Sequence, residues 1–372
     1  MSDTASTDVL LSGQSLECSR DDRLLFSGLS FELESGQVLQ IEGANGSGKT
    51  SLLEAIYVLC LGRSFRSHRA ADLVRFGQAE LTVTGCLQQM NGHSVQVGVQ
   101  KSRKDTQIRF DGQAIFSTSV LARRLPIVLL TPDSHVELFS APKERRRLLD
   151  MALFHVKQHY LDVWKRYLRC LKHRNQLLRQ SRGPRDIRAW NQQLVMAANR
   201  VHQERLECVA RLQSILRTLL SASIGEQIEI RYDAGWDQQV GYDAVLENCM
   251  DGDLQMAYTR FGPHRADIVL MADGVRVERS FSRGQLKLVT AALLLAQAHY
   301  VSDATGVAPL LLVDDLVSDL DSEARNHLIQ LLAGVQSQVL MTMIDSNTLT
   351  TVPSHHRTTL FHVEQGAVQR AA

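Results

Sequence analysis

The sequence has few of the features that mark exported or membrane proteins. Its cysteines are scattered and form no C-x-x-C pair, so we expect reduced thiols that are mostly packed in the interior. They are six in number: Cys18, Cys60, Cys86, Cys170, Cys208 and Cys249. The first residues contain no basic region followed by an apolar one, and no uncharged apolar run approaches the roughly 18–20 residues that span a bilayer. We therefore expect a soluble cytoplasmic protein without a membrane partner.

Neither repeats nor low-complexity tracts are visible, and the overall charge is almost balanced. A formal net charge of +1 over 372 residues names no partner by itself. Hydrophobic residues make up 44% of the chain and charged residues 22%, which is an ordinary composition for a globular protein with a sizeable core. The length fits one large domain with an inserted lobe, or two domains.

Two kinds of periodicity alternate along the chain. Short or alternating apolar runs predict strands. They lie near residues 38–41, 80–110, 127–130, 309–313 and 338–342. Helical spacing of apolar residues marks 51–59, 286–298 and 322–333. Between 144 and 222 apolar residues recur every three to four positions around a break at 181–184, which predicts a long helical hairpin inserted between two α/β stretches.

A glycine-rich motif stands between the first predicted strand and the first predicted helix. It matches G-x-x-x-x-G-K-[ST] at every position and reads Gly43, Ala44, Asn45, Gly46, Ser47, Gly48, Lys49 and Thr50. Glycines let successive backbone N–H groups face phosphate oxygens at a helix N-terminus. Lys49 would reach the β- and γ-phosphates of ATP, and the Thr50 hydroxyl would ligate Mg²⁺. The alternative is a chance glycine-rich turn, which the flanking strand and helix disfavour.

A strongly apolar run ends in two carboxylates, Asp314 and Asp315. The pattern predicts that Asp314 holds Mg²⁺ through water and that Asp315 polarises the water that attacks the γ-phosphate. Strand ends often carry acidic residues, so this pair alone is weak evidence for an ATPase site. The block Ser318-Asp319-Leu320-Asp321 just beyond strengthens it.

A third motif precedes the helix predicted at 286–298 and resembles the S-G-G-Q signature of ABC ATPases. It consists of Ser282, Arg283, Gly284 and Gln285. Such a turn is commonly structural. Here it stands between the P-loop and the Asp314-Asp315 pair, in the order of ABC ATPases, which favours a signature whose Ser282 contacts the nucleotide of an opposite subunit. We therefore predict an α/β fold, an ABC-type P-loop ATPase head with a mixed sheet plus an antiparallel layer and an inserted helical arm lobe. The head comprises residues 1–130 and 258–372, and the inserted basic helical lobe comprises 131–257.

Positive charge is concentrated in the helical insert. Between Lys143 and Arg182 the chain has twelve Lys and Arg against three acids, a local balance of +9. A solvated helix face usually alternates in sign, so this pattern favours a polyanionic partner such as DNA. A second basic cluster follows the glycine-rich motif at 62–69. The candidate DNA contacts are Arg63, Arg66, Arg69, Arg145, Arg146 and Arg147.

Together these motifs resemble the RecF family of bacterial recombination mediators, which are relatives of the SMC ATPases. The similar stretches are 43–65, 131–150, 258–267 with Gly-Pro-His-Arg at 262–265, 282–287 and 314–321. The resemblance implies an ATP-dependent homodimer on double-stranded DNA and on junctions between single and double strands. It also implies slow DNA-stimulated ATP hydrolysis and cooperation with RecR and RecO in loading RecA, in recombinational repair and replication-fork maintenance.

Some features depart from that family. Residues 15–42 look more like the start of an exporter ATPase subunit of the haem type, and no aromatic residue stands at a convincing adenine-stacking position. Two alternatives therefore stay open. One is the nucleotide-binding subunit of an ABC transporter, opposed by the basic insert and by Asp-Asp where transporters usually carry Asp-Glu. The other is a structural SMC-like clamp with negligible hydrolysis.

Overall fold

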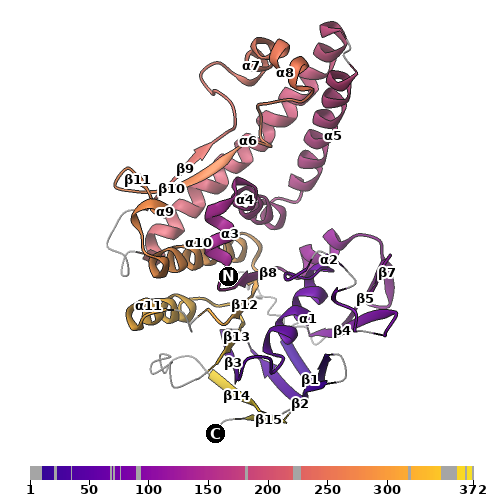
Figure 1. Cartoon of the computed structure of the whole chain (residues 1–372), viewed down its shortest axis with the longest axis vertical. Coiled ribbons are helices and arrows are strands. Elements are labelled where there is room, and N and C mark those ends of the chain that lie inside the picture. Colours follow the sequence, from indigo (N-terminus) through magenta and orange to yellow (C-terminus); the bar gives the residue numbers. More distant parts are fainter. Residues whose placement is uncertain are drawn as a thin grey trace, which may run out of the picture. The chain divides into compact units, whose positions relative to one another are not determined.

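The computed structural model describes residues 11–20, 23–34, 36–67, 69, 72–75, 77–88, 94–180, 183–220, 228–316, 320–344, 358–364 and 367–370. The chain forms two compact units (Figure 1). Unit 1 combines Met1–Ser134 with Val301–Ala372, and unit 2 is His135–Tyr300. Unit 2 is therefore inserted into the sequence of unit 1.

The main sheet of unit 1 has six strands among the described residues, in the order β15-β14-β3-β13-β12-β8. Their bounds are β3 Val38–Gly43, β8 Ile127–Leu130, β12 Leu310–Asp314, β13 Val339–Met343, β14 Thr358–Glu364 and β15 Ala367–Arg370. All pair in parallel except β15, which is antiparallel to β14. All five residues of β13 are buried, as expected for an inner strand of a parallel sheet. The carboxyl ends of the parallel strands meet at one edge, where α/β proteins bind ligands.

A second sheet of unit 1 is antiparallel and has the order β4-β5-β6-β7. The strands are β4 Glu80–Gln88, β5 Ser94–Ser102, β6 Thr106–Phe110 and β7 Gln113–Ile115. Asp111 and Gly112, with φ of 52° and 75°, make the turn between β6 and β7 that the sequence predicts. Alternate residues of β5 (Val95, Val97 and Val99) are buried, so one face of this sheet belongs to the core.

The remaining elements of unit 1 surround these sheets. The strands β1 Leu11–Arg20 and β2 Arg23–Leu33 form an antiparallel pair, and the helices are α1 Lys49–Leu61, α2 Thr118–Arg124 and α11 Ser322–Ala333. Left-handed glycines flank α1, Gly48 at its start and Gly62 at its end. The Asp321 side chain caps α11 by accepting a hydrogen bond of 2.8 Å from the Ala324 backbone N–H.

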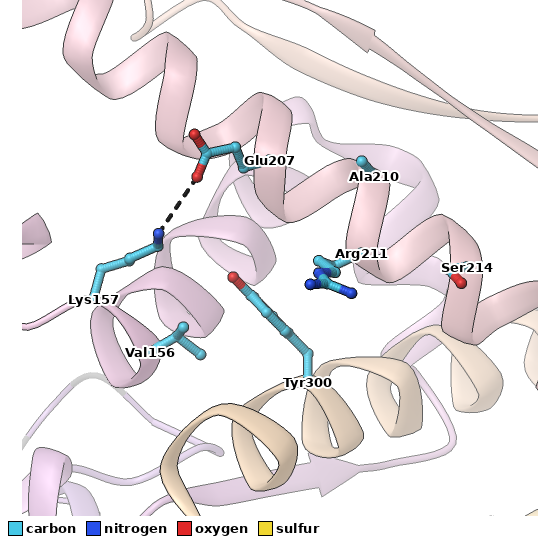
Figure 2. A pocket seen from close by; sticks show the side chains of 7 residues that line it. All are labelled: Val156, Lys157, Glu207, Ala210, Arg211, Ser214 and Tyr300. Carbon is cyan, nitrogen blue, oxygen red and sulfur yellow. Dashed lines mark hydrogen bonds and ion pairs between the residues drawn. The ribbon is translucent and has the colours of Figure 1, made fainter.

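Unit 2 is built on a helical hairpin of α5 Tyr160–Arg179 and α6 Pro184–Leu220, which pack through Tyr167, Cys170, Leu194, Ala198 and Val201. The other helices, of which the first residue of α3 and the last five of α10 belong to unit 1, are α3 Ser134–Ser140, α4 Pro142–Val156, α7 Tyr242–Asn248, α8 Met250–Met256, α9 Val277–Ser280 and α10 Arg283–Thr305. The strands β9 Ile228–Asp233, β10 Asp267–Ala272 and β11 Val275–Arg276 form a small antiparallel sheet. The end of α4 and the sides of α6 and α10 border a pocket (Figure 2).

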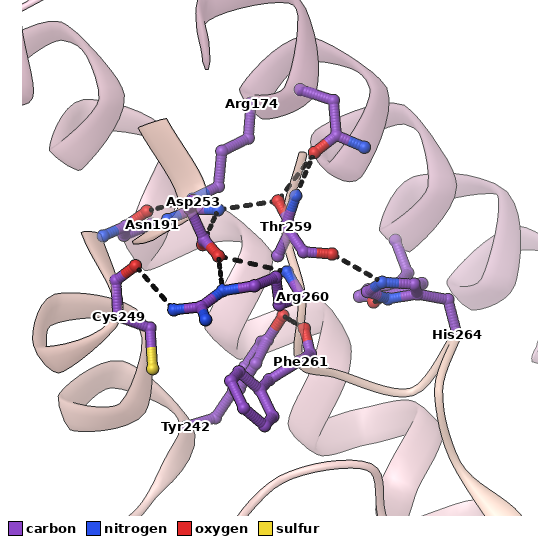
Figure 3. A network of polar contacts seen from close by, with 11 residues as sticks. Arg174, Asn191, Tyr242, Cys249, Asp253, Thr259, Arg260, Phe261 and His264 are labelled. Carbon is purple, nitrogen blue, oxygen red and sulfur yellow. Dashed lines mark hydrogen bonds and ion pairs between the residues drawn. The ribbon is translucent and has the colours of Figure 1, made fainter. Parts of the chain in front are cut away.

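A buried polar network fixes the segment that carries the Gly-Pro-His-Arg stretch (Figure 3). Arg174 of α5 is fully buried and donates hydrogen bonds of 2.8 Å to Asp253 and 2.6 Å to the Thr259 hydroxyl. His264 donates from Nε2 to the Thr259 carbonyl at 3.0 Å and accepts at Nδ1 from the Tyr167 hydroxyl at 2.6 Å. Burial lowers the pKa of His264 to about 4, so the imidazole is neutral near pH 7 and Nδ1 is free to accept from Tyr167.

The predicted α/β fold, with a mixed sheet, an antiparallel layer and a helical hairpin, is confirmed. The helix predicted at 286–298 is longer and extends over 283–305 as α10. Ser318 and Asp319 lie outside the described residues. The chain passes from unit 1 to unit 2 after Ser134 and returns to unit 1 after Tyr300. The division into a head of residues 1–130 and 258–372 and a helical lobe of residues 131–257 stays a prediction. No helix in the described part of the chain is both long and apolar enough to span a membrane.

Candidate nucleotide-binding site

The glycine-rich motif connects the carboxyl end of β3 with the N-terminus of α1. Gly46 and Gly48 have φ of 81° and 97°, a backbone region that favours glycine. A Cβ at Gly43 would lie 2.5 Å from the Val363 carbonyl oxygen and 2.9 Å from the Ser47 hydroxyl. The loop therefore has a shape that favours glycine, by backbone conformation at Gly46 and Gly48 and by lack of space at Gly43.

Lys49, the first residue of α1, is folded over the loop. It is buried, and its ammonium donates hydrogen bonds of 2.6 Å to the Gly43 carbonyl and 2.9 Å to the Ala44 carbonyl. Burial lowers the pKa of Lys49, and the carboxylates of Asp315, Asp314 and Glu42 oppose that shift. The lysine thus places a partly desolvated positive charge inside the loop, which suits recognition of a phosphate.

Asp314, at the end of β12, joins the loop to the neighbouring strand. The Thr50 hydroxyl donates to Asp314 Oδ1 at 3.0 Å, and the Thr342 hydroxyl donates to the same oxygen at 2.7 Å. Thr342 is opposite Asp314 in the parallel register of β12 and β13 and is fully buried. Two hydroxyls therefore fix one carboxylate beside the P-loop.

These groups fit Mg²⁺ bound with ATP. The Thr50 hydroxyl and the Asp314 carboxylate are the hard oxygen ligands that Mg²⁺ prefers. Within the described ranges, no group of three or more His, Cys, Asp or Glu residues could hold a metal ion. A cation here would therefore take few protein ligands and complete its shell with phosphate and water, as Mg²⁺ commonly does.

Asp315 follows at the edge of the sheet in a left-handed conformation with φ of 43°. Its backbone N–H donates to both the carbonyl and the hydroxyl oxygen of Thr342, each at 3.1 Å. Left-handed backbone at a residue other than glycine is strained and is often found in active sites. Thr342 thus positions both aspartates, a role that the sequence did not indicate.

The signature-like residues lie in unit 2, at the N-terminus of α10. The Ser282 N–H donates to Gln285 Oε1 at 2.8 Å, and the Gln285 N–H donates to the Ser282 hydroxyl at 3.3 Å. This is a capping box, which gives the pair a structural role at the helix start. Both side chains are exposed, as contact with a second subunit requires.

The candidate DNA contacts divide into exposed and buried arginines. Arg63, Arg66 and Arg69 are exposed in unit 1, and Arg66 lies 3.7 Å from Glu54. In unit 2, Arg145 is only 7% exposed and binds Asp267 through two hydrogen bonds of 2.8 and 2.9 Å. Its donors are engaged inside unit 2, so we reassign Arg145 from DNA contact to the scaffold.

The two neighbours of Arg145 on α4 differ from it. Arg146 donates to the Ala266 carbonyl at 2.8 Å, and burial, with the nearby Arg205, lowers its pKa. Arg147 is 43% exposed and has a weak pair with Glu144 at 3.3 Å. Among these three residues, Arg147 alone is well exposed to solvent.

Comparisons with known proteins place these motifs in context. The RecF/RecN/SMC N terminal domain family matches residues 30–369. The chain is 37% identical over 334 residues to the DNA replication and repair protein RecF of Shewanella baltica, covering 88% of this chain and 91% of the relative. It is 38% identical over 344 residues to the protein of that name from Pseudomonas putida, covering 90% and 93%.

Solved structures resemble the fold. One is the recombination mediator protein RecF with ATP in the RecFOR pathway, with a TM-score of 0.81, 22% identity and coverage of 100% of both chains. An SMC head bound to the C-winged helix domain of ScpA has a TM-score of 0.55 and 13% identity, covering 98% of this chain and 96% of the other. The head fold expected from the motifs is therefore confirmed.

Proposed function

Because this chain belongs to the RecF family of DNA replication and repair proteins, within the wider RecF/RecN/SMC family, we propose that it is an ATP-dependent DNA-binding protein of recombinational repair and replication-fork maintenance. The observation that carries this proposal is the contact of Thr50 with Asp314 beside Lys49. That cluster is suited to the phosphates and Mg²⁺ of a bound ATP. We place the protein in the cytoplasm.

The P-loop holds the nucleotide in this proposal. Backbone N–H groups of residues 43–50 bind phosphate oxygens at the start of α1. Lys49 exchanges its bonds to the loop carbonyls for bonds to the β- and γ-phosphates, while Thr50 and Asp314 hold Mg²⁺. When bound, Mg²⁺ neutralises phosphate charge and polarises the γ-phosphoryl group. Asp315 orients the attacking water through its carboxylate.

A second copy of the chain completes the site. Ser282 of one subunit contacts the γ-phosphate in the other, with Arg283, Gly284 and Gln285 shaping the turn. The exposure of the Ser282–Gln285 capping box supports this arrangement, because a group that acts across an interface must be reachable. Replacing Ser282 by alanine should abolish dimer-dependent hydrolysis and leave ATP binding by the monomer intact. Hydrolysis is slow and is stimulated by DNA in this proposal.

The DNA surface is best supported on the outer face of α5. Six basic or imidazole side chains are exposed there: Lys165, Arg166, Arg169, Lys172, His173 and Arg179. Within the described ranges none of the five lysines and arginines forms an ion pair, and the one exposed acid on this face is Asp162. Unpaired charges of one sign at helical spacing suit the phosphate backbone and not base edges. Arg147, Arg63, Arg66 and Arg69 stay candidate contacts.

The partners of the protein are proposed in more detail than the family assignment provides. We propose that the ATP-bound dimer recognises duplex DNA next to single-stranded gaps, and that RecR and RecO cooperate with it in loading RecA. The family match argues against the transporter alternative. The clamp alternative, in which ATP only joins two heads, is distinguished by turnover: Asp315→Asn should lower the hydrolysis rate and preserve dimerisation.

DNA binding with and without ATP tests the proposal. A labelled gapped duplex is titrated with protein from about 50 to about 200 mM salt, a range in which phosphate contacts weaken strongly. Tight binding that strengthens with ATP in the wild type, and not in Lys49→Arg, supports the proposed function. Binding that is absent with and without ATP refutes it.

The surface is tested by neutralising Lys165, Arg169 and Lys172 together with glutamine. Each lost phosphate contact reduces the slope of log K against log salt by about 0.9, so the triple variant should lose about 2.7. Arg231→Gln with Arg276→Gln is the matched control, since both arginines are exposed but already pair with Glu229 and Glu278. An unchanged slope in the triple variant would move the DNA surface away from α5.

A further inference from the structure

A pocket of about 600 Å³ lies within unit 2, between the end of α4 and the facing sides of α6 and α10 (Figure 2). It is lined by Val156, Lys157, Glu207, Ala210, Arg211, Ser214 and Tyr300. Its volume is within the range of ligand-binding pockets. None of its residues belongs to the proposed nucleotide site or to the basic face of α5, so neither function accounts for it.

The floor of the pocket is Tyr300 of α10, whose side chain is only 8% exposed. Figure 2 shows its hydroxyl directed between Lys157 and Arg211, and among the residues that the structure describes no group hydrogen-bonds to it. Burial raises the pKa of Tyr300 to about 12, so the hydroxyl is protonated at neutral pH. The Tyr300 hydroxyl is thus a donor that faces the pocket, where an acceptor of a ligand can take the place of water.

The charged groups around the pocket are unequally compensated. Lys157 lies 3.4 Å from Glu207 and 3.7 Å from Glu204. Glu204, only 2% exposed, also binds Arg200 at 2.6 Å and His159 at 2.8 Å. Arg211 is exposed and forms no ion pair in the described part of the chain. The unused groups are therefore a guanidinium, which favours an anionic acceptor, and a hydroxyl that can donate to the same carboxylate.

Four of the residues that line the pocket belong to α6. Glu207, Ala210, Arg211 and Ser214 recur at helical spacing on one face and extend over about 10 Å at 1.5 Å per residue. That length equals about three residues of an extended peptide. Ala210, Arg211 and Ser214 are exposed, so the pocket is open along this side and suits a chain that passes across it.

We propose that this pocket binds an acidic segment of a partner protein, with a carboxylate held by Arg211 and Tyr300 and an apolar side chain against Val156 and Ala210. A nucleic acid is disfavoured because Glu207, 49% exposed at the rim, would repel a chain that carries a phosphate at every nucleotide. A peptide can place one carboxylate at Arg211 and neutral groups beside Glu207. The occupant also touches α10, whose N-terminus follows Ser282, so it contacts the helix that carries the signature-like residues.

The test is ¹⁹F NMR of the full-length protein labelled with fluorotyrosine. The chain has seven tyrosines, and the Tyr300 resonance is assigned by its loss in Tyr300→Phe. Titration with the amidated peptide Leu-Glu-Leu-Glu should shift this resonance, and Leu-Gln-Leu-Gln should not. Arg211→Gln should weaken binding at least tenfold, while Glu207→Gln should strengthen it because a repelling charge is removed. Arg217→Gln, an exposed residue on α6 outside the lining, is the control and should change nothing.

The outcomes separate this site from the proposed function, because the measurement needs neither ATP nor DNA. A Tyr300 resonance that does not move, or that moves equally with the glutamine peptide, overturns the proposal. So does equal weakening by Arg211→Gln and Arg217→Gln. A larger shift with oligothymidylate than with the acidic peptide would assign the pocket to nucleic acid and overturn it as well.

Discussion

Breaking the ion pair between Arg174 and Asp253 should destabilise unit 2 severely. The side chains are 0% and 1% exposed, and their closest approach is 2.8 Å. Arg174→Met removes the guanidinium but leaves the Asp253 carboxylate buried, with only Arg260 still bound to it at 3.1 Å. Removing one partner of a buried pair typically costs about 3–5 kcal/mol, because the other charge stays desolvated without compensation. We expect about 3 kcal/mol here, since Arg260 compensates in part.

Urea unfolding followed by tryptophan fluorescence measures this loss. The three tryptophans, Trp164, Trp190 and Trp236, all belong to unit 2, so the signal reports that unit. With a urea slope of about 2 kcal/mol per molar, a loss of about 3 kcal/mol lowers the midpoint by about 1.5 M. The matched control is Arg188→Met, since Arg188 pairs with Glu247 at the surface and should leave the midpoint unchanged.

A double variant distinguishes a lost pair from lost packing. Arg174→Met combined with Asp253→Leu removes both charges, and apolar replacement of a whole buried pair is often close to neutral. The double variant should therefore be more stable than either single variant. Additive losses, or a midpoint for Arg174→Met within about 0.5 M of the wild type, would refute the reasoning that the buried Asp253 carboxylate destabilises the unit when it loses its partner.

Three further outcomes follow from single positions. Thr342→Val should weaken Mg²⁺-dependent ATP binding about tenfold by calorimetry, because a hydrogen bond to a charged group contributes about 1.5–3 kcal/mol, whereas Thr342→Ser keeps the hydroxyl and should bind normally. Gly48→Ala should lower thermal stability and ATP binding more than Gly306→Ala does, since both have positive φ but only Gly48 would place a Cβ 3.0 Å from Leu25 and Phe26. The third outcome concerns pH: between pH 7.5 and pH 5 the free energy of unfolding, measured by fluorescence, should fall by about 2 kcal/mol because of His264. In the unfolded chain this imidazole takes up a proton near pH 6.5, whereas in the folded protein its pKa is about 4. His264→Gln should remove that part of the pH dependence. A variant that loses as much stability as the wild type between pH 7.5 and pH 5 would contradict this prediction.

Much of the head could be predicted because its signals are local. The P-loop combines a strand, fixed glycines and a helix within a few residues, and the apolar strand before Asp314 is equally distinct. Thr342 could not be found in this way. It lies in a strand whose other residues are apolar. Its role depends on its contact with Asp314 on the neighbouring strand, 28 positions away in sequence. Neither strand carries a local sequence signal that pairs Thr342 with Asp314.

The charge count of the helical insert misled for a different reason. It treated all arginines between 143 and 182 alike, but Arg145 and Arg174 point inward. Arg145 precedes the buried Leu148 and Leu149 by three and four positions, so helical periodicity places it on the apolar face of α4. Their partners, Asp267 and Asp253, lie outside the counted window. Counting only the arginines that lie opposite the apolar face of each predicted helix would have separated the buried arginines from the exposed ones.

The most specific sequence signals and the proposed DNA surface therefore lie in different places. The Gly-Pro-His-Arg stretch is held through buried hydrogen bonds of Arg174, Arg205 and Tyr167, and a substitution among these residues leaves buried polar groups unpaired. Phosphate contacts at the proposed DNA surface of α5 would be made by any Lys or Arg at a suitable position along the helix. We therefore expect the Gly-Pro-His-Arg stretch to determine stability, and the proposed DNA surface of α5 to determine affinity for DNA. Substitutions in the first group should change unfolding midpoints, and substitutions in the second should change salt slopes.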